Sequence, residues 1–238
     1  MKHTLHIAGL LCIWSACGEM GKEPSTLAPP QVLGARANPR TVSYGTTVEL
    51  EAITHGVETL QWFVCFGPYI PDGDPRCATE PEFAELELGV GASMPLAIPD
   101  ASTFESSGVD VPAIYVRMLA SGEEGQQTSV ATIPFAQEGT HPEIDAFLDE
   151  NNEAPATNVL VESTFALKPQ LVVSDGAEDV LITWFVEGGE ADPFRTRNAE
   201  ETTITSSAAP GPMRVIAVIR DDNFGVGWYE TTFTVTAP

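Results

Sequence analysis

One six-residue stretch occurs twice in the chain and constrains its fold more than any other feature. Residues 60–65 read LQWFVC, and residues 182–187, 122 positions later, read ITWFVE. In each copy the tryptophan, Trp62 or Trp184, shares one face with the apolar residues two positions away. A period of two is the strand period, and tryptophan with β-branched neighbours favours a half-buried pleated surface. The repeat therefore predicts two similar β-domains, each packed around its own tryptophan.

Short strand-like runs separated by turn residues fill both halves of the chain. In the first half they are Val32–Ala37, Thr46–Ala52, the Trp62 stretch, Ala84–Leu88, Met94–Ile98, Ala113–Leu119 and Thr128–Phe135. In the second half they are Ile144–Leu148, Phe165–Val173, the Trp184 stretch, Thr202–Thr205, Met213–Ile219 and Val226–Thr236. A chain of 238 residues has room for two domains of roughly 100 residues each. The pattern predicts an all-β fold of two antiparallel sandwiches, at 32–136 and 143–238, joined by a linker at 137–142.

The order of elements in each half is similar to that of bacterial immunoglobulin-like and PKD-like modules. The second half shows it best, with the Trp184 strand, a Pro-Gly turn at 210–212, an apolar strand, an acidic turn at 221–223 and a final strand. The resemblance covers about 200 residues. It implies an exported or surface protein whose modules serve as binding domains, adhesive units or spacers. The fold alone does not select among these roles.

The N-terminus reads as an export signal. Residues 1–16 combine the basic Lys2 with an apolar run at 7–14 that is too short to span a bilayer. Ser15-Ala16-Cys17 resembles the end of a bacterial lipobox, which implies cleavage before Cys17, a diacylglycerol on its sulfur and an acylated amine. Gly18 favours the outer membrane by similarity to lipoprotein sorting. The alternative is an ordinary signal peptide that leaves Cys17 as a free thiol.

Residues 17–31 are predicted to be a flexible tether, because Pro24, Pro29 and Pro30 occur among Gly, Ser and Glu residues. Two or three acyl chains would hold the protein stably on a membrane. We therefore expect a protein anchored by lipid in the bacterial cell envelope, either periplasmic or surface-exposed.

The charge of the chain limits its partners. Lys and Arg number 11 against 34 Asp and Glu, and loss of Lys2 with the signal leaves a formal charge of −24. Binding to the phosphates of nucleic acid or anionic lipid needs clustered Lys and Arg, so the composition argues against both partners. It favours solubility, a basic partner or a divalent cation.

Cys65 and Cys77 are predicted to form a disulfide, because they remain after the signal is removed and Cys17 is lipidated, and exported compartments are oxidising. Cys65 lies three residues after Trp62, so it points away from the core face. The bond would therefore close the loop at 66–76. It would differ from the core disulfide of antibody domains, which bridges two sheets. Closing such a loop stabilises the fold by roughly 3 kcal/mol.

The loop closed by this disulfide carries Phe66, Tyr69 and Ile70, which makes it the candidate binding loop. Two other roles are open for these side chains. They could cap the core of their own domain, or Tyr69 and Ile70 could pack the joint between the domains.

A calcium site is the chemical hypothesis that the sequence offers. In a standard sandwich the loop at 174–179 and the last hairpin meet at one pole, where hard Ca²⁺ could find several of the roughly six to eight oxygens it needs. The candidate ligands are Asp175, Glu178, Asp179, Asp221, Asp222 and Asn223. The alternative is a solvated acidic pole, and no other cofactor is predicted.

Nothing in the sequence predicts an enzyme. His55 and His141 are the only histidines after the signal, and no nucleophile elbow, phosphate loop or zinc-protease motif is present. Acidic pairs occur at strand or turn positions that face solvent, which does not suit general acid catalysis. We predict a lipid-anchored envelope protein with a non-catalytic binding or adhesion role toward a protein or glycan. The alternative is a structural spacer or a subunit of an envelope complex. If the predicted calcium site exists, bound Ca²⁺ would stiffen that spacer or subunit.

Overall fold

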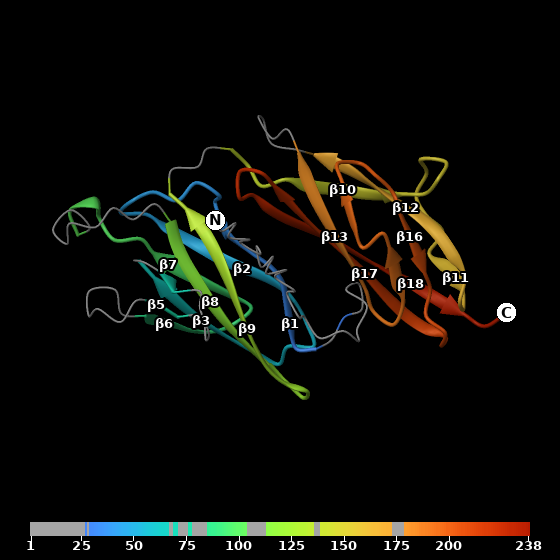
Figure 1. Cartoon of the computed structure of the whole chain (residues 1–238), viewed down its shortest axis with the longest axis horizontal. Helices are drawn as coiled ribbons and strands as arrows, with labels where there is room; N and C mark the ends of the chain where they lie inside the picture. The colour runs from blue at the N-terminus through green and yellow to red at the C-terminus, as the bar shows by residue number, and fades with distance from the viewer. Residues whose placement is uncertain are drawn as a thin grey trace, which may run out of the picture.

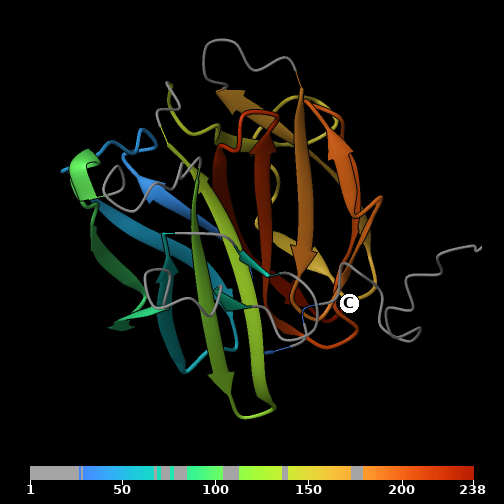
Figure 2. The same ribbon diagram turned by 60° about the vertical axis from the view of Figure 1, so that its left-hand side comes forward.

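The computed structural model describes Leu27 and residues 29–66, 69–70, 76–77, 85–103, 113–135, 139–172 and 179–238, with 69–70 and 76–77 described by main chain alone. The fold is all-β and consists of two immunoglobulin-like sandwiches, which lie side by side in both views (Figures 1 and 2). Within the described part of the chain, no helix is long and apolar enough to cross a membrane.

The first sandwich pairs a three-stranded sheet, in the order β1-β2-β7, with a four-stranded sheet, in the order β6-β3-β8-β9. All pairings within both sheets are antiparallel. A small two-stranded sheet, β4-β5, accompanies them. The strands are β1 (Gln31–Asn38), β2 (Thr47–His55), β3 (Thr59–Cys65), β4 (Tyr69–Ile70), β5 (Arg76–Cys77), β6 (Leu86–Val90), β7 (Ser93–Ala97), β8 (Ala113–Gly122) and β9 (Gly125–Pro134).

The second sandwich pairs a four-stranded sheet, in the order β10-β12-β16-β14, with a five-stranded sheet, in the order β11-β18-β17-β13-β15. One pairing departs from the predicted antiparallel pattern, because β11 runs parallel to β18 at the edge of the five-stranded sheet. The strands are β10 (Glu143–Leu148), β11 (Asn158–Leu160), β12 (Thr164–Val172), β13 (Val180–Val186), β14 (Glu190–Asp192), β15 (Arg195–Arg197), β16 (Thr202–Thr205), β17 (Gly211–Asp221) and β18 (Val226–Thr236).

The repeated tryptophan is the centre of each core, as the sequence predicted. Trp62 and Trp184 are fully buried, and each packs within a separate apolar cluster of its own domain. Each indole N–H finds a partner, as a buried tryptophan requires. Trp62 donates to the carbonyl of Gly91 at 2.7 Å, and Trp184 donates to the hydroxyl of Thr196 at 2.9 Å.

The structure also settles which residues of β8 face the core, a question that the almost continuously apolar sequence leaves open. Ile114, Val116, Met118 and Ala120 are buried in the cluster around Trp62. The even-numbered residues of β8 therefore point inward.

The two sandwiches pack against each other through the outer faces of their sheets. β1 lies on the side of domain one that faces domain two, where it contacts β18 (Figure 1). On β17, Val215 to Ile219 are all buried, because one face of the strand lines the core of domain two and the other lies against domain one. A strand covered on both faces favours such a continuous apolar run over alternation.

Candidate functional site at the joint between the domains

An apolar cluster separate from both cores forms the centre of the joint. Leu33 of β1 and Ile53 of β2 pack with Ile216 and Val218 of β17 and Phe185 of β13. Ile53, Phe185, Ile216 and Val218 alternate with the core residues of their own strands, so their side chains leave the sandwich and meet the neighbouring domain. Gly34 permits the close approach, since a Cβ there would lie 3.1 Å from a methyl carbon of Val218.

Leu27 joins the same cluster with 8% of its surface exposed. The sequence had assigned this residue to the tether at 17–31. Because Leu27 is packed, the segment free to act as a tether ends before it.

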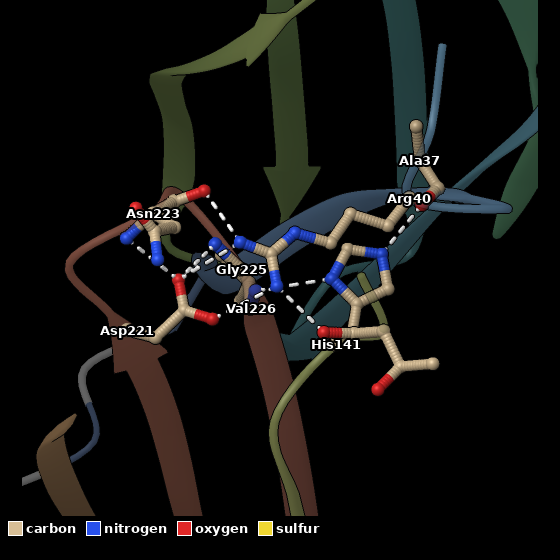
Figure 3. A network of polar contacts seen from close by, with 8 residues as sticks. Ala37, Arg40, His141, Asp221, Asn223, Gly225 and Val226 are labelled. Atoms are coloured by element: carbon tan, nitrogen blue, oxygen red, sulfur yellow. Dashed lines mark hydrogen bonds and ion pairs between the residues drawn. The ribbon is translucent and has the colours of Figure 1, made fainter. Parts of the chain in front are cut away.

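A buried ion pair joins the domains beside this cluster (Figure 3). Arg40, two residues after β1, donates from Nη1 to Oδ2 of Asp221 at 2.9 Å and from Nη2 to Oδ1 at 3.2 Å. The two side chains are only 5% and 0% exposed. Arg40 also donates to the carbonyls of Thr140 and Asn223, each at 2.6 Å. One guanidinium thus ties domain one to the segment before β10 and to the β17–β18 turn.

The Asp221 carboxylate is held from its own turn as well. Its Oδ1 accepts the main-chain N–H groups of Asn223 at 3.0 Å and Gly225 at 2.6 Å. A carboxylate that accepts several N–H bonds and a bidentate arginine has the strong, oriented partners that a buried charge needs.

His141 is a second polar link across the joint, and both of its ring nitrogens bond to main-chain groups (Figure 3). Nε2 lies 2.6 Å from the carbonyl oxygen of Ala37, while Nδ1 accepts the N–H of Val226 at 3.2 Å. This pattern requires the neutral ring with its proton on Nε2. An imidazole held in this way has no nitrogen free to act as a catalytic base.

Two further arginines contact the partner domain. The guanidinium of Arg36 stacks over the ring of Trp228 at 4.2 Å, and Arg220 donates to the carbonyl of Leu33 at 2.8 Å. Beside Arg220 the joint opens into a cleft of about 350 Å³ between β1, β9 and the β17–β18 turn. Phe224 lines this cleft with 58% of its surface exposed.

The described joint does not lie where the sequence had suggested. The sequence offered Tyr69 and Ile70, at a pole of domain one, as packing between the domains. The observed contacts lie on the faces of β1 and β2, since outward-facing apolar residues there supply the area to be buried. The side chains of Tyr69 and Ile70 lie outside the described residues. Phe66, the third member of the predicted binding loop, packs against the core of domain one.

The structure describes only part of the predicted disulfide and lipidation sites. Cys65 is buried at the end of β3, lies outside the cluster around Trp62 and is in the disulfide-bonded form. The side chain of Cys77 lies outside the described residues, so the pairing of these two cysteines stays a prediction. The predicted lipidation site, Cys17, also lies outside the described residues.

The structure uses the described members of the predicted calcium site in other ways. Asp221 is bound by Arg40, and Asp179 forms an ion pair with Arg197. Asp222 and Asn223 are exposed in the turn, while Asp175 and Glu178 lie outside the described residues. No group of three or more His, Cys, Asp or Glu side chains able to hold a metal ion occurs among the residues that the structure describes.

Comparisons with known proteins give only distant structural likenesses. No family model matches the chain. No curated protein matches it either. Among solved structures, it is similar to the tandem Ig repeats of Dlar, at 13% identity and a TM-score of 0.33, over 88% of this chain and 98% of that one.

Two other solved structures share this likeness. The fibronectin(III)-like modules of CbhA from Clostridium thermocellum match at 10% identity and a TM-score of 0.29, over 86% of this chain and 95% of that one. The titin domains z1z2 in complex with telethonin match at 13% identity and a TM-score of 0.27, over 89% of this chain and all of that one. The assignment of two immunoglobulin-like sandwiches rests on the observed sheets.

Replacing Asp221 by Asn tests the ion pair. The substitution keeps the size of the side chain but removes the negative charge that faces the buried Arg40 guanidinium. We expect the free energy of unfolding to fall by about 3–5 kcal/mol, since breaking a buried pair leaves a charge uncompensated. Urea unfolding followed by tryptophan fluorescence measures this.

The matched control is Asp179→Asn, which breaks the ion pair with Arg197 at the surface. The side chains of that pair are 64% and 43% exposed, so the loss should stay below about 1 kcal/mol. Equal losses for the two variants would contradict the role given to Asp221.

The joint should weaken in acid because of His141. Burial is the largest effect on the pKa of His141 and lowers it, and the charges of Arg36 and Arg40 lower the pKa further. The hydrogen bond to Ala37 and the charge of Asp221 act in the opposite direction and raise the pKa. The pKa of His141 is therefore lower in the folded protein than its value of about 6.5 in the unfolded chain. The contribution of His141 to stability is complete above about pH 6.5 and is lost as the pH falls through the folded pKa. We expect the melting temperature to fall from about pH 7.5 to about pH 5.

His141→Gln separates this effect from the titration of carboxylates, because glutamine can still donate to Ala37 but does not ionise. The variant should start less stable near neutral pH and then change less with acid than the wild type. Parallel pH profiles for the two proteins would show that His141 does not control the joint.

Proposed function

We propose that this chain is a lipid-anchored protein of the bacterial cell envelope, whose two immunoglobulin-like domains act together as a non-catalytic binding or adhesion unit. The observation that carries the proposal is the buried joint. Arg40, Asp221 and the cluster around Ile216 fix one domain against the other, so surfaces from both domains can be presented to a partner in a constant arrangement. Such preorganisation reduces the entropy lost on binding.

The same joint favours a binding unit over a simple spacer. Modules joined end to end give the greatest reach for a given number of residues. Here the sheets pack face to face (Figures 1 and 2), which shortens the molecule and buries apolar area. A spacer gains little from that arrangement, whereas a recognition surface gains rigidity.

The tether sets how far this unit can stand from a membrane. Ten peptide bonds separate Cys17 from the packed Leu27, and a fully extended chain of that length reaches about 35 Å. A lipid on Cys17 would therefore keep the joint close to the bilayer. The partner we propose is a protein or glycan of the envelope, since a net charge of −23 disfavours nucleic acid.

Metabolic labelling with an alkyne fatty acid tests the anchor. We expect the wild-type chain to be labelled and to fractionate with membranes, because acylated Cys17 buries its chains in the bilayer. Cys17→Ser should lose both properties. Cys12→Ser is the matched control and should keep them, since Cys12 would be removed with the signal. Label that persists in Cys17→Ser would refute the anchor.

Cross-linked capture from intact envelopes tests the binding role. We expect the wild-type chain to enrich a defined protein or glycan, and an excess of free chain to compete for it. Enrichment that does not exceed the control without cross-linker would contradict a binding role and would leave the anchoring result intact.

A further inference from the structure

The longest edge strand of the described sheets lacks the usual protection against pairing with another strand. β9 has ten residues, and within the described part of the chain it pairs along its length only with β8. The free edge of a strand is a template for a further strand, and natural proteins block it with charged side chains, proline, a bulge or a short length. From Gly125 to Ile133 the strand has no charged residue, no proline and no register shift.

The other edge strands of the four large sheets carry such protection. β1, β6 and β10 each contain a bulge and at least one charged residue. β7 contains Pro95, and β11, β14 and β15 have only three residues each. β9 is therefore the exception among these strands, in a chain whose 34 acidic residues could have supplied a charge.

The β8–β9 hairpin determines which main-chain groups of β9 are free. A two-residue turn joins the strands and places Gly122 opposite Gly125, and the residues that flank such a turn exchange both of their hydrogen bonds. Hydrogen-bonded pairs then recur at every second position, which on β9 means the odd-numbered residues. The N–H and C=O groups of Val130 and Thr132 therefore point away from β8, toward the free edge.

The cleft of about 350 Å³ at the joint lies along this edge, where β1 runs beside β9 (Figure 1). Four consecutive residues of β9, 129–132, and four consecutive residues of β1, 32–35, line it. Neighbouring residues of a strand point to opposite faces, so a cleft lined by four in a row borders the edge of the strand. The cleft is thus a gap between two strand edges, one from each sheet of domain one. Its volume is within the range of ligand pockets, roughly 300–1,000 Å³.

The two sides of this gap differ in chemistry. Met118, a core residue of domain one, lines the inner side between the two sheets. Domain two lines the outer side with the exposed Phe224 and the half-buried Arg220. Asp221 also borders the cleft, but Arg40 balances its charge. Arg220 has no ion pair within the described part of the chain.

We propose that this cleft binds an extended segment of a partner protein, which adds to β9 as a further strand. Main-chain hydrogen bonds to Val130 and Thr132 would give the affinity, and alternate side chains of the segment would give the specificity. A side chain that points inward, toward Met118, should be apolar. The next one would point outward, toward Arg220, and should be acidic, because a guanidinium group matches a carboxylate. This inference rests on the binding role proposed above and specifies the kind of partner.

The β17–β18 turn favours a single segment over a second copy of this chain. Two sandwiches that joined edge to edge would need both β9 edges open, and the turn lies beside the edge at 129–132. The turn is also fixed in place, since Asp221 accepts the N–H groups of Asn223 and Gly225. Phe224 between them has a left-handed backbone with a φ of 62°, which a bulky residue keeps only where its surroundings hold it.

Selection from a phage library of random dodecapeptides, against the full chain in a non-ionic detergent, tests the proposal. We expect one enriched family of sequences with an apolar residue next to an acidic one. A synthetic peptide of that family should slow the amide hydrogen exchange of Val130 and Thr132, measured by NMR, because an added strand takes up both N–H groups. No enriched family, or slower exchange elsewhere but not in β9, would overturn the proposal.

Val130→Pro is the decisive variant, because it removes a free N–H of the cleft and leaves the hydrogen bonds between β8 and β9 in place. We expect it to weaken peptide binding at least about tenfold. Gln126→Pro is the matched control, since Gln126 has the same orientation on β9 but lies outside the cleft. Its affinity should stay close to that of the wild type. Equal affinities for the two variants, with melting temperatures that show both to be folded, would contradict strand addition.

A double-mutant cycle tests the contact with Arg220. The acidic residue of the peptide is replaced by its amide, both with the wild-type chain and with Arg220→Gln. Each single change should weaken binding, and the two together should weaken it little further, because both remove the same pair. Fully additive losses would contradict this contact.

Failure of this inference is distinguishable from failure of the binding role. If cross-linked capture enriches a partner from intact envelopes but the peptide experiments fail, strand addition to β9 is wrong and the binding role stands. If the peptides bind as expected and Val130→Pro also abolishes the cross-linked capture, both proposals are supported.

Discussion

The arrangement of the two domains depends on the buried pair between Arg40 and Asp221. Such a pair adds little net stability compared with apolar side chains of the same size, because both charges lose their water. The apolar cluster of the joint supplies the favourable free energy, on the order of 10 kcal/mol gross for its six buried side chains. The ion pair selects the geometry, because any displacement of the domains would leave both charges buried without their partner.

The other polar contacts of the joint depend on the same geometry. His141 bonds to Ala37 in domain one and to Val226 in domain two, so it requires both domains in place. The same holds for the hydrogen bond from Arg220 to Leu33.

The sequence was sufficient for the fold because the fold depends on local patterns. Alternation around Trp62 and Trp184 predicted both cores, and every long strand lies within a few residues of its predicted position. The missed strands are β4 and β5, with two residues each, and β11, β14 and β15, with three residues each, which is too short to show a period. The pairing of β11, β14 and β15 comes from the neighbouring strands and not from their own composition.

The joint could not be predicted in the same way, because Arg40 and Asp221 lie 181 positions apart and each alone resembles an ordinary turn residue. Asp221 was read as a candidate calcium ligand for this reason. One signal was present, however. The unbroken apolar run from Val215 to Ile219, together with Phe185 at an outward position of the repeat, is typical of strands buried on both faces. It identifies the covered sheet but not the surface that covers it.

Differential scanning calorimetry of the full chain tests most directly whether the joint makes the two sandwiches one structural unit. If it does, both domains unfold in a single transition whose van't Hoff enthalpy equals the calorimetric enthalpy. Two separable transitions, each with the enthalpy of one sandwich, would show that the domains are independent and would contradict the account.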